Sequence, residues 1–138
     1  MRRLLICGDR FWTDYQSILR CIKKAEKTEH IDMLIEGECR GADKLGRRAA
    51  EEIGLSIDAG SILPFPADWE RYQLGAGPIR NQQMLDEGKP TEVWAFHNRL
   101  DQSTGTRDMV RRALKAGLTV WHITDHTFRK LSENKLLP

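Results

Sequence analysis

The chain alternates short apolar runs with segments of helical periodicity, and this alternation constrains the fold more than any other feature. Nearly continuous apolar runs occupy residues 4–7, 33–35, 93–96 and 118–123, and a weaker run occupies 61–65. Runs without polar alternation are typical of parallel strands that are buried on both faces. Strand–helix alternation of this kind predicts an α/β fold, a single Rossmann-like, doubly wound and mainly parallel sheet flanked by helices.

The order of the elements predicts a central first strand and one domain. The run Leu4 to Cys7 is short, wholly apolar and followed by a glycine, so we expect it in the middle of the sheet. Gly54 and Gly117 are expected to end two of the helices. We expect the whole chain, 1–138, to form one domain, with residues 128–138 as a peripheral C-terminal helix and tail.

Three predicted helices carry apolar residues at helical spacing, which gives each of them one face for the core. These residues are Tyr15, Ile18, Leu19, Ile22 and Ala25 in the first helix, Ala42, Leu45, Ala49 and Ile53 in the second, and Met109, Val110, Ala113 and Leu114 in the last.

Two further segments, RNQQM at 80–84 and TGTRDM at 104–109, are each expected to open a helix. A helix N-terminus presents unpaired backbone N–H groups and the positive end of the helix dipole. Two such ends near one another would bind a phosphate group. A nucleotide-like ligand is therefore the leading hypothesis.

Composition excludes several classes of protein. The chain has 138 residues, 40% of them apolar, which suits one compact core. Its 22 Lys and Arg are interleaved with 20 Asp and Glu, so we expect no nucleic-acid partner. No apolar run approaches the roughly 18 residues that span a membrane, and the N-terminus lacks a signal-peptide core, so we expect a cytoplasmic protein. Three cysteines without a close pair fit a reducing compartment.

The residues that follow the apolar runs are the candidates for ligand binding, because ligands of such sheets bind beyond the carboxyl ends of the strands. Glycines there let the backbone approach a ligand, and Arg10 and Arg40 are suited to bidentate phosphate contacts. Each glycine taken alone is more typical of a simple turn, but their shared placement favours a site. The expected ligand-binding residues are Gly8, Asp9, Arg10, Gly37, Arg40, Gly41, Asp43, Asp68, Trp69, Arg80, Asn81, His97, Ser103, Thr104, Gly105 and Thr106.

Several side chains keep two interpretations. Trp69 with Asp68 would stack a base and hold a ribose hydroxyl, or the tryptophan packs as a lid on the core. His97 would donate to a phosphate or act as an acid, whereas His122 is expected in the core. Cys39 beside an arginine is expected as a small buried side chain. No histidine and carboxylate spacing matches a metal site, so we expect no metal and no cofactor. The basic residues of the last predicted helix are expected to form a solvated face: Arg107, Arg111, Arg112 and Lys115.

Four segments together resemble the YspA-like, cpYpsA-related branch of the SLOG superfamily. They are GDRFWTD at 8–14, EGECRGADKLGRRAAEEIG at 36–54, FPADWERYQLGAGPIRNQQML at 65–85 and STGTRDMVRRALKAG at 103–117. The resemblance implies a Rossmann-like domain that binds nucleotides or nucleotide-derived ligands. Some members are sensor domains in bacterial and phage conflict systems. Such domains often dimerise through helices beside the site, which implies a homodimer.

The enzymatic branch of that superfamily, the LOG-type phosphoribohydrolases, cleaves the bond between base and ribose phosphate, and this chain departs from its motifs. Gly105-Thr106 is present, but Met109 stands where those enzymes place a glutamate. Asp108 is about 100° around a helix from that position. Arg80-Asn81 stands in place of an Arg-Lys pair, which retains the arginine that faces phosphate or ribose. The resemblance therefore implies that phosphate binding is retained and that the hydrolytic apparatus is incomplete.

Three functions follow from these observations. The first is a binder that senses or sequesters a nucleotide-derived small molecule. The second is a divergent nucleoside 5'-monophosphate phosphoribohydrolase, an N-glycosidase whose carboxylate is Asp9, Glu36, Glu38 or Asp108. The third is an interaction module with a vestigial pocket. The sequence favours the first and leaves open whether any catalysis occurs, with Glu38 and Asp108 as the named catalytic candidates.

Overall fold

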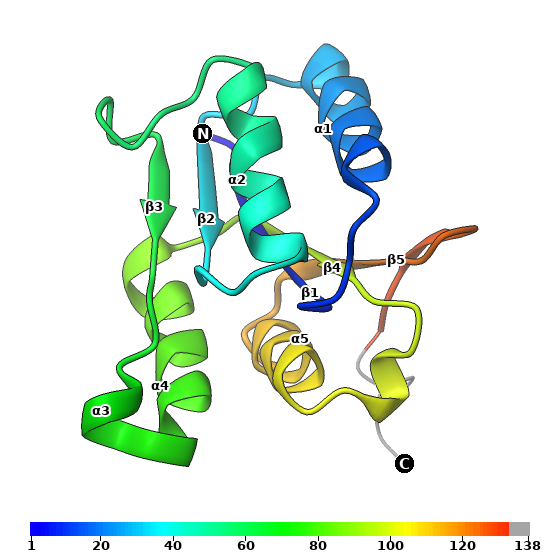
Figure 1. Ribbon diagram of the computed structural model, residues 1–138. Helices are drawn as coiled ribbons and strands as arrows, with labels where there is room; N and C mark the ends of the chain where they lie inside the picture. The colour runs from blue at the N-terminus through cyan, green and yellow to red at the C-terminus, as the bar shows by residue number, and fades with distance from the viewer. Residues whose placement is uncertain (133–138) are drawn as a thin grey trace.

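The computed structural model describes residues 1–132, which form one six-stranded sheet in the order β3-β2-β1-β4-β5-β6 (Figure 1). The first five strands are parallel, and β6 is antiparallel to β5. The α/β architecture predicted from the apolar runs is confirmed, and β1 lies in the middle of the sheet between β2 and β4. The strands are β1 (Arg3–Gly8), β2 (Met33–Glu36), β3 (Ile62–Pro64), β4 (Glu92–Phe96), β5 (Thr119–Ile123) and β6 (Phe128–Lys130).

Helices cover both faces of the sheet because each strand directs alternate side chains to opposite sides. Leu4 and Ile6 of β1 pack in one core with residues of α1 (Tyr15–Thr28) and α2 (Ala42–Glu52). Leu5 and Cys7 pack in the other core with α5 (Gly105–Lys115) and the start of the π-helical turn η2 (Met84–Gly88). The remaining helical elements are α3 (Trp69–Tyr72), η1 (Gln73–Gly75), α4 (Ala76–Gln83) and η3 (Leu100–Gln102).

The predicted helix stops are confirmed. α2 ends at Glu52 and Gly54 follows with φ +100°, while α5 ends at Lys115 and Gly117 follows with φ +83°. Both are left-handed conformations that glycine adopts without steric cost. No helix of residues 1–132 has the length and apolarity that a membrane span requires.

The expectation that RNQQM opens a helix is wrong. α4 begins at Ala76, so Arg80 and Asn81 lie inside it. Pro78 occupies the first turn, where its missing N–H has no intrahelical partner to lose, so the proline is accommodated within the helix instead of preceding it. The second segment, TGTRDM, does open a helix, because α5 begins at Gly105.

The C-terminal helix expected within residues 128–138 is wrong where the structure describes this segment. Residues 128–130 form β6, whose Phe128 packs against Trp94 and Trp121 with ring centroids 5.7 and 5.0 Å away. This aromatic contact and the pairing with β5 favour a strand over a short isolated helix. The rest of the expected helix and tail, residues 133–138, lies outside the described residues.

Tight packing of α2 on β1 predicts the effect of one substitution. A Cβ added at Gly46 would lie 2.9 Å from Cδ1 and from Cγ2 of Ile6, closer than real Cβ contacts. We expect Gly46→Ala to lower the free energy of unfolding by about 1–3 kcal/mol. In α4, a Cβ at Gly77 would lie 3.6 Å from Trp69, an ordinary contact. Gly77→Ala should therefore be neutral or stabilising by roughly 0.5–1 kcal/mol. Urea unfolding of both variants tests this, and an equal response would contradict the packing.

Candidate functional site

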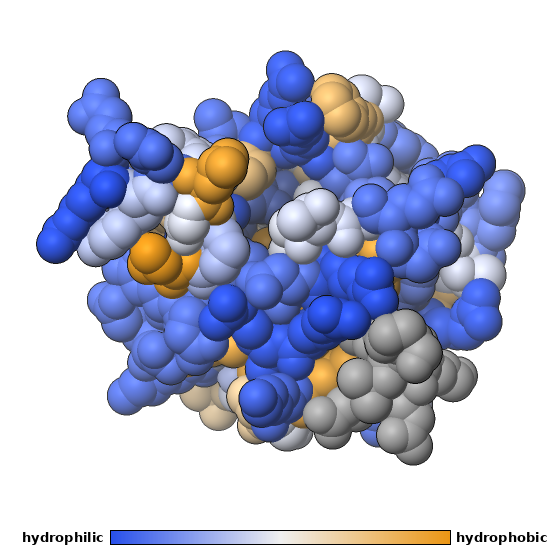
Figure 2. All heavy atoms as spheres, turned by 90° about the horizontal axis from the view of Figure 1, so that it is seen from below, coloured by the Kyte–Doolittle hydropathy of each residue, from blue (hydrophilic) through white to orange (hydrophobic). Residues whose placement is uncertain are grey.

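The candidate site lies where the strand order reverses, at the carboxyl ends of β1 and β4. Connections from these neighbouring strands leave in opposite directions along the sheet, and this arrangement opens a crevice for ligands. The two loops are adjacent, since the backbone N–H of Asp9 donates to the Phe96 carbonyl at 2.8 Å. Figure 2 shows this end of the molecule, whose surface is mainly hydrophilic with separate apolar patches.

Gly8 and Gly41 are required by contacts between protein segments. A Cβ at Gly8 would lie 2.3 Å from the Phe96 carbonyl oxygen. Gly41 has φ +80°, and a Cβ there would lie 2.4 Å from the Asp9 carbonyl oxygen. The close backbone approach expected at these glycines is therefore made by the β1–α1 loop and the start of α2. Whether a ligand also approaches them stays a prediction.

A buried polar network joins the loop after β2 to α4. Asp43 accepts hydrogen bonds from the N–H groups of Gly37 and Cys39 at 3.1 and 3.3 Å. Arg80 donates to the Gly37 carbonyl and to the side-chain oxygen of Asn81, and its Nη atoms lie 3.8 Å from the Cys39 sulfur. A Cβ at Gly37 would lie 2.6 Å from the Arg80 guanidinium. Glycine is thus needed here to admit an arginine.

The network continues from α4 to α5. Asn81 donates to the Gly105 carbonyl at 3.3 Å and to the Asp108 carboxylate at 3.0 Å. Asp108 also accepts from Arg112 Nε at 2.8 Å, and Arg112 donates to Gln82 at 3.0 Å. The structure therefore brings Gly37, Asp43, Arg80, Asn81 and Gly105 together in one hydrogen-bond network. Arg80 and Asn81 hold protein groups in place, and Arg112 does not belong to a purely solvated face.

The sequence analysis treated Arg112 as an exposed residue and did not identify its partners. The i, i+4 spacing of Asp108 and Arg112 on one helix was the signal that would have identified the pair. Arg47 and Phe11 were also missed. Arg47 donates to Glu38 at 3.0 Å and lies 3.6 Å from Glu36, which no local spacing in the sequence indicates. The exposed ring of Phe11 has the guanidinium carbons of Arg10 and Arg40 at 5.0 and 5.2 Å from its centroid.

Burial changes the acidity of two carboxyl groups beside the network. Glu36 is fully buried; its Oε1 accepts from the Glu38 N–H at 2.6 Å, and its Oε2 has no hydrogen-bond partner among the described residues. Burial raises the pKa of Glu36 to about 7, although the Glu38 N–H and Arg47 oppose this shift. Burial likewise raises the pKa of Asp43 to about 6 against the opposing charge of Arg80. Both groups are held by protein partners.

The N-termini of α1, α2 and α5 follow β1, β2 and β4 at this edge of the sheet, and their first N–H groups have different acceptors. At α1 the carboxylate of Asp14 accepts from the Ser17 N–H. At α2 the first N–H donates to the Asp9 carbonyl, and Asp43 lies in the first turn. At α5 the hydroxyl of Ser103 accepts from the Thr106 N–H at 3.1 Å, while Thr104 and Gly105 are exposed. At α5 the capping acceptor is therefore a neutral hydroxyl, and the acidic residue of the first turn, Asp108, is paired with Arg112.

His97 follows β4 and is half-buried. Its Nδ1 accepts from the Arg99 N–H at 3.0 Å, which assigns the proton of the neutral ring to Nε2 and makes that atom a donor. Burial lowers the pKa of His97, although Asp9 opposes this shift. His122 is half-buried, not in the core, and its Nε2 lies 2.6 Å from the His97 carbonyl oxygen.

The remaining candidates lie at the margin of the crevice or in the core. Asp68 caps α3 by accepting from the Arg71 N–H at 3.1 Å, and Trp69 is 54% exposed beside Gly77 of α4. Thr106 is buried, and Met109 packs in the second core. Within residues 1–132, no cluster of His, Cys, Asp and Glu is arranged to hold a metal ion.

Comparison with known proteins identifies relatives of the chain. Residues 2–72 match the sequence model of the YspA, cpYpsA-related SLOG family. The gene 61 protein of Mycobacterium phage D29 is 33% identical over 128 residues, which cover 91% of this chain and 98% of the phage protein. No solved structure matches the chain.

The burial of Glu36 predicts a pH dependence of stability. A folded-state pKa of about 7 lies above the value of 4.5 for an ordinary glutamate, so the folded state holds the proton more tightly. The stabilising contribution is complete below pH 4.5 and is lost as the pH rises through about 7. Glu36→Gln should remove this part of the decline, on the order of 1–3 kcal/mol, in urea unfolding between pH 4.5 and 7.5. The exposed Glu87→Gln is the control, and an unchanged decline in Glu36→Gln would refute the assignment.

Proposed function

The chain belongs to the YspA, cpYpsA-related SLOG family, and from this membership we propose that it binds a nucleotide or nucleotide-derived ligand without hydrolysing it. Family membership suggests a nucleotide-related binding role or a LOG-like one. The choice between these two roles rests on whether the carboxylates near the candidate site are free to act on a ligand. Those near the candidate site are buried or engaged by protein donors, while the N-terminus of α5 remains accessible to an anion.

The proposed phosphate position is the N-terminus of α5. The helix dipole and the first backbone N–H groups favour an anion there. The only acidic residue in the first turn, Asp108, is paired with Arg112 and hydrogen-bonded by Asn81. A Cβ at Gly105 would meet no atom within 4 Å, which leaves space for a phosphate group. The α1 and α2 termini lack this combination.

The rest of the ligand is proposed to extend across the β1–β4 crevice. There the Asp9 carboxylate suits ribose hydroxyls, and the Nε2–H of His97 suits a second acceptor on the ligand. Trp69 is exposed enough to stack a base, and this role stays a prediction. These assignments keep the sequence-derived set of residues but remove Arg80 from direct contact with phosphate, because its donors are engaged by Gly37 and Asn81.

The arrangement of carboxylates supports binding over glycosidic hydrolysis. Cleavage of a base–ribose bond develops positive charge on the sugar, which requires a carboxylate near the anomeric carbon or an acid near the base. Asp108 is held by two donors, Glu36 is fully buried, and Glu38 pairs with Arg47. Within residues 1–132, Asp9 at the crevice accepts from the Phe11 N–H through one oxygen only, so a divergent N-glycosidase is the second candidate. Similarity to a mycobacteriophage protein supports a phage context for the binder.

The proposed phosphate position predicts opposite effects of one substitution on stability and binding. Gly105→Asp places an acid in the first turn of α5, where the helix dipole stabilises it by about 0.3–1 kcal/mol. The same charge should repel a phosphate and weaken binding of a nucleoside monophosphate at least about tenfold. Gly105→Asn has nearly the same shape without the charge and should retain most of the affinity. Calorimetry with adenosine and guanosine monophosphates measures both, and equal affinities of the two variants would refute the position.

Absence of turnover is the second expectation. Purified protein incubated with the common nucleoside monophosphates should release no free base detectable by chromatography, because Glu36 is buried and the carboxylates of Asp9, Glu38 and Asp108 each accept from a protein donor. Base release that disappears in Asp9→Asn would overturn the binder and establish the glycosidase. Failure both to release base and to bind any of these nucleotides would favour an interaction module instead.

A further inference from the structure

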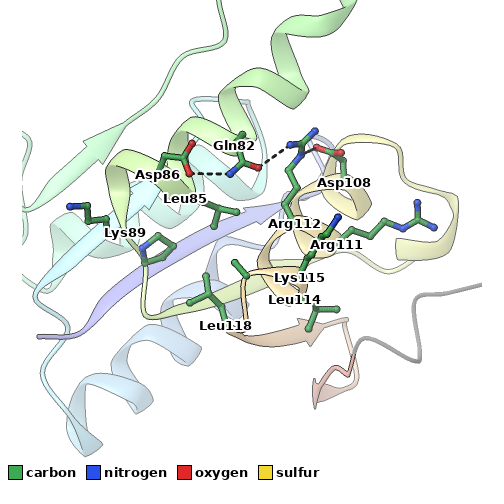
Figure 3. A pocket seen from close by; sticks show the side chains of 12 residues that line it. Gln82, Leu85, Asp86, Lys89, Asp108, Arg111, Arg112, Leu114, Lys115 and Leu118 are labelled. Atoms are coloured by element: carbon green, nitrogen blue, oxygen red, sulfur yellow. Dashed lines mark hydrogen bonds and ion pairs between the residues drawn. The ribbon is translucent and has the colours of Figure 1, made fainter.

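A groove of about 910 Å³ lies between η2 and α5, the elements that cover the second core, beside the candidate nucleotide site (Figure 3). It extends along α5 from Asp108 in the first turn to Ala116 just beyond the last. Lys89 and Pro90, which follow η2, line the opposite wall. A helix of 11 residues is about 16 Å long, so the groove has room for roughly three turns of a second helix.

The floor of the groove is apolar. Leu85, Leu114 and Leu118 line it, and each is a half-buried side chain that packs against the second core. Figure 3 shows Leu85 approaching from the η2 side and Leu114 and Leu118 lying below it. These leucines extend the core to the surface of the described structure, and burial of the remaining apolar area would favour binding of another apolar surface.

The rim of the groove is cationic. Four basic side chains line it against two acidic ones. Lys89, Arg111 and Lys115 are exposed and form no ion pair within residues 1–132. Asp108 is paired with Arg112, whereas Asp86 accepts from the neutral amide of Gln82 at 3.0 Å and keeps its charge. Among the described residues, three unpaired cations therefore face one unpaired carboxylate, and the net charge of the rim is positive.

We propose that this groove binds an acidic amphipathic helix of a partner protein. Apolar side chains spaced one helical turn apart would cover the three leucines, and carboxylates beside them would pair with Lys89, Arg111 and Lys115. The charge of the rim selects this occupant over a second copy of the same face. A two-fold contact through this face would bring the two cationic rims together. The proposal does not depend on the identity of the nucleotide.

The test uses three labelled 15-residue peptides and fluorescence anisotropy with the full chain. The probe carries leucine at helical spacing with flanking glutamates, the second peptide has the same composition in scrambled order, and the third has lysine in place of every glutamate. We expect only the probe to bind. Its affinity should fall as the salt concentration rises, because the rim charges are exposed to solvent.

Two matched double variants each reverse two positive charges, one on α5 and the other on α1, which covers the opposite face of the sheet. Arg111→Glu with Lys115→Glu alters the groove, and the probe should bind this variant at least about tenfold more weakly. Lys23→Glu with Lys24→Glu alters exposed residues of α1 by the same net charge and should leave the affinity unchanged. Circular dichroism of both variants establishes that they are folded.

Three outcomes would overturn the proposal. The first is no binding of the probe or equal binding of the scrambled peptide, and the second is unchanged affinity in a folded groove variant. The third is self-association of the chain in sedimentation experiments that the groove variant abolishes, which would assign the groove to a second copy.

Discussion

The buried guanidinium of Arg80 is the contact on which the candidate site depends. It connects α4 to the loop after β2, because it donates to the Gly37 carbonyl and contacts the Cys39 sulfur of that loop, and it also donates to the neighbouring Asn81. Asn81 in turn holds the first turn of α5 through Gly105 and Asp108. The position of the α5 terminus relative to the sheet is thus set by hydrogen bonds that begin at Arg80. Glycine at position 37 is the condition that makes this possible, since a Cβ would occupy the space of the guanidinium.

Retention of such a network needs a reason other than stability. A buried ion pair is costly to desolvate, and apolar residues of similar volume are often equally stabilising. The raised pKa values of Glu36 and Asp43 are signs of that cost. The network instead provides geometry, because directional hydrogen bonds fix the orientation of backbone groups more narrowly than apolar packing does. A phosphate site formed by the end of a helix requires that the helix be held at a defined distance from the strand ends, and this is the relation that the network maintains.

The sequence predicted the parts of the fold that depend on local periodicity. The apolar runs identified the parallel strands, and the glycines at 54 and 117 identified two helix ends, because burial on both faces and left-handed backbone leave direct marks in the sequence. It failed at RNQQM, because α4 begins four residues earlier at Ala76 and includes Pro78 in its first turn. It failed again at residues 128–130, where aromatic contacts with Trp94 and Trp121 select a strand. The first failure concerns a local helix boundary, and the second arises from contacts between distant segments.

The same limit applies to the site. Arg80 and Asn81 were identified as important residues, yet a sequence cannot show whether an arginine faces a ligand or a carbonyl 43 positions away. The distinction changes the chemistry, because a guanidinium whose donors are engaged by protein groups has fewer left for phosphate oxygens. The proposed anion binding then rests on backbone N–H groups of α5, which carry no side-chain signature. Since Asp108 belongs both to this helix terminus and, through Arg112 and Gln82, to the wall of the adjoining groove, the two surfaces share one hydrogen-bonded support.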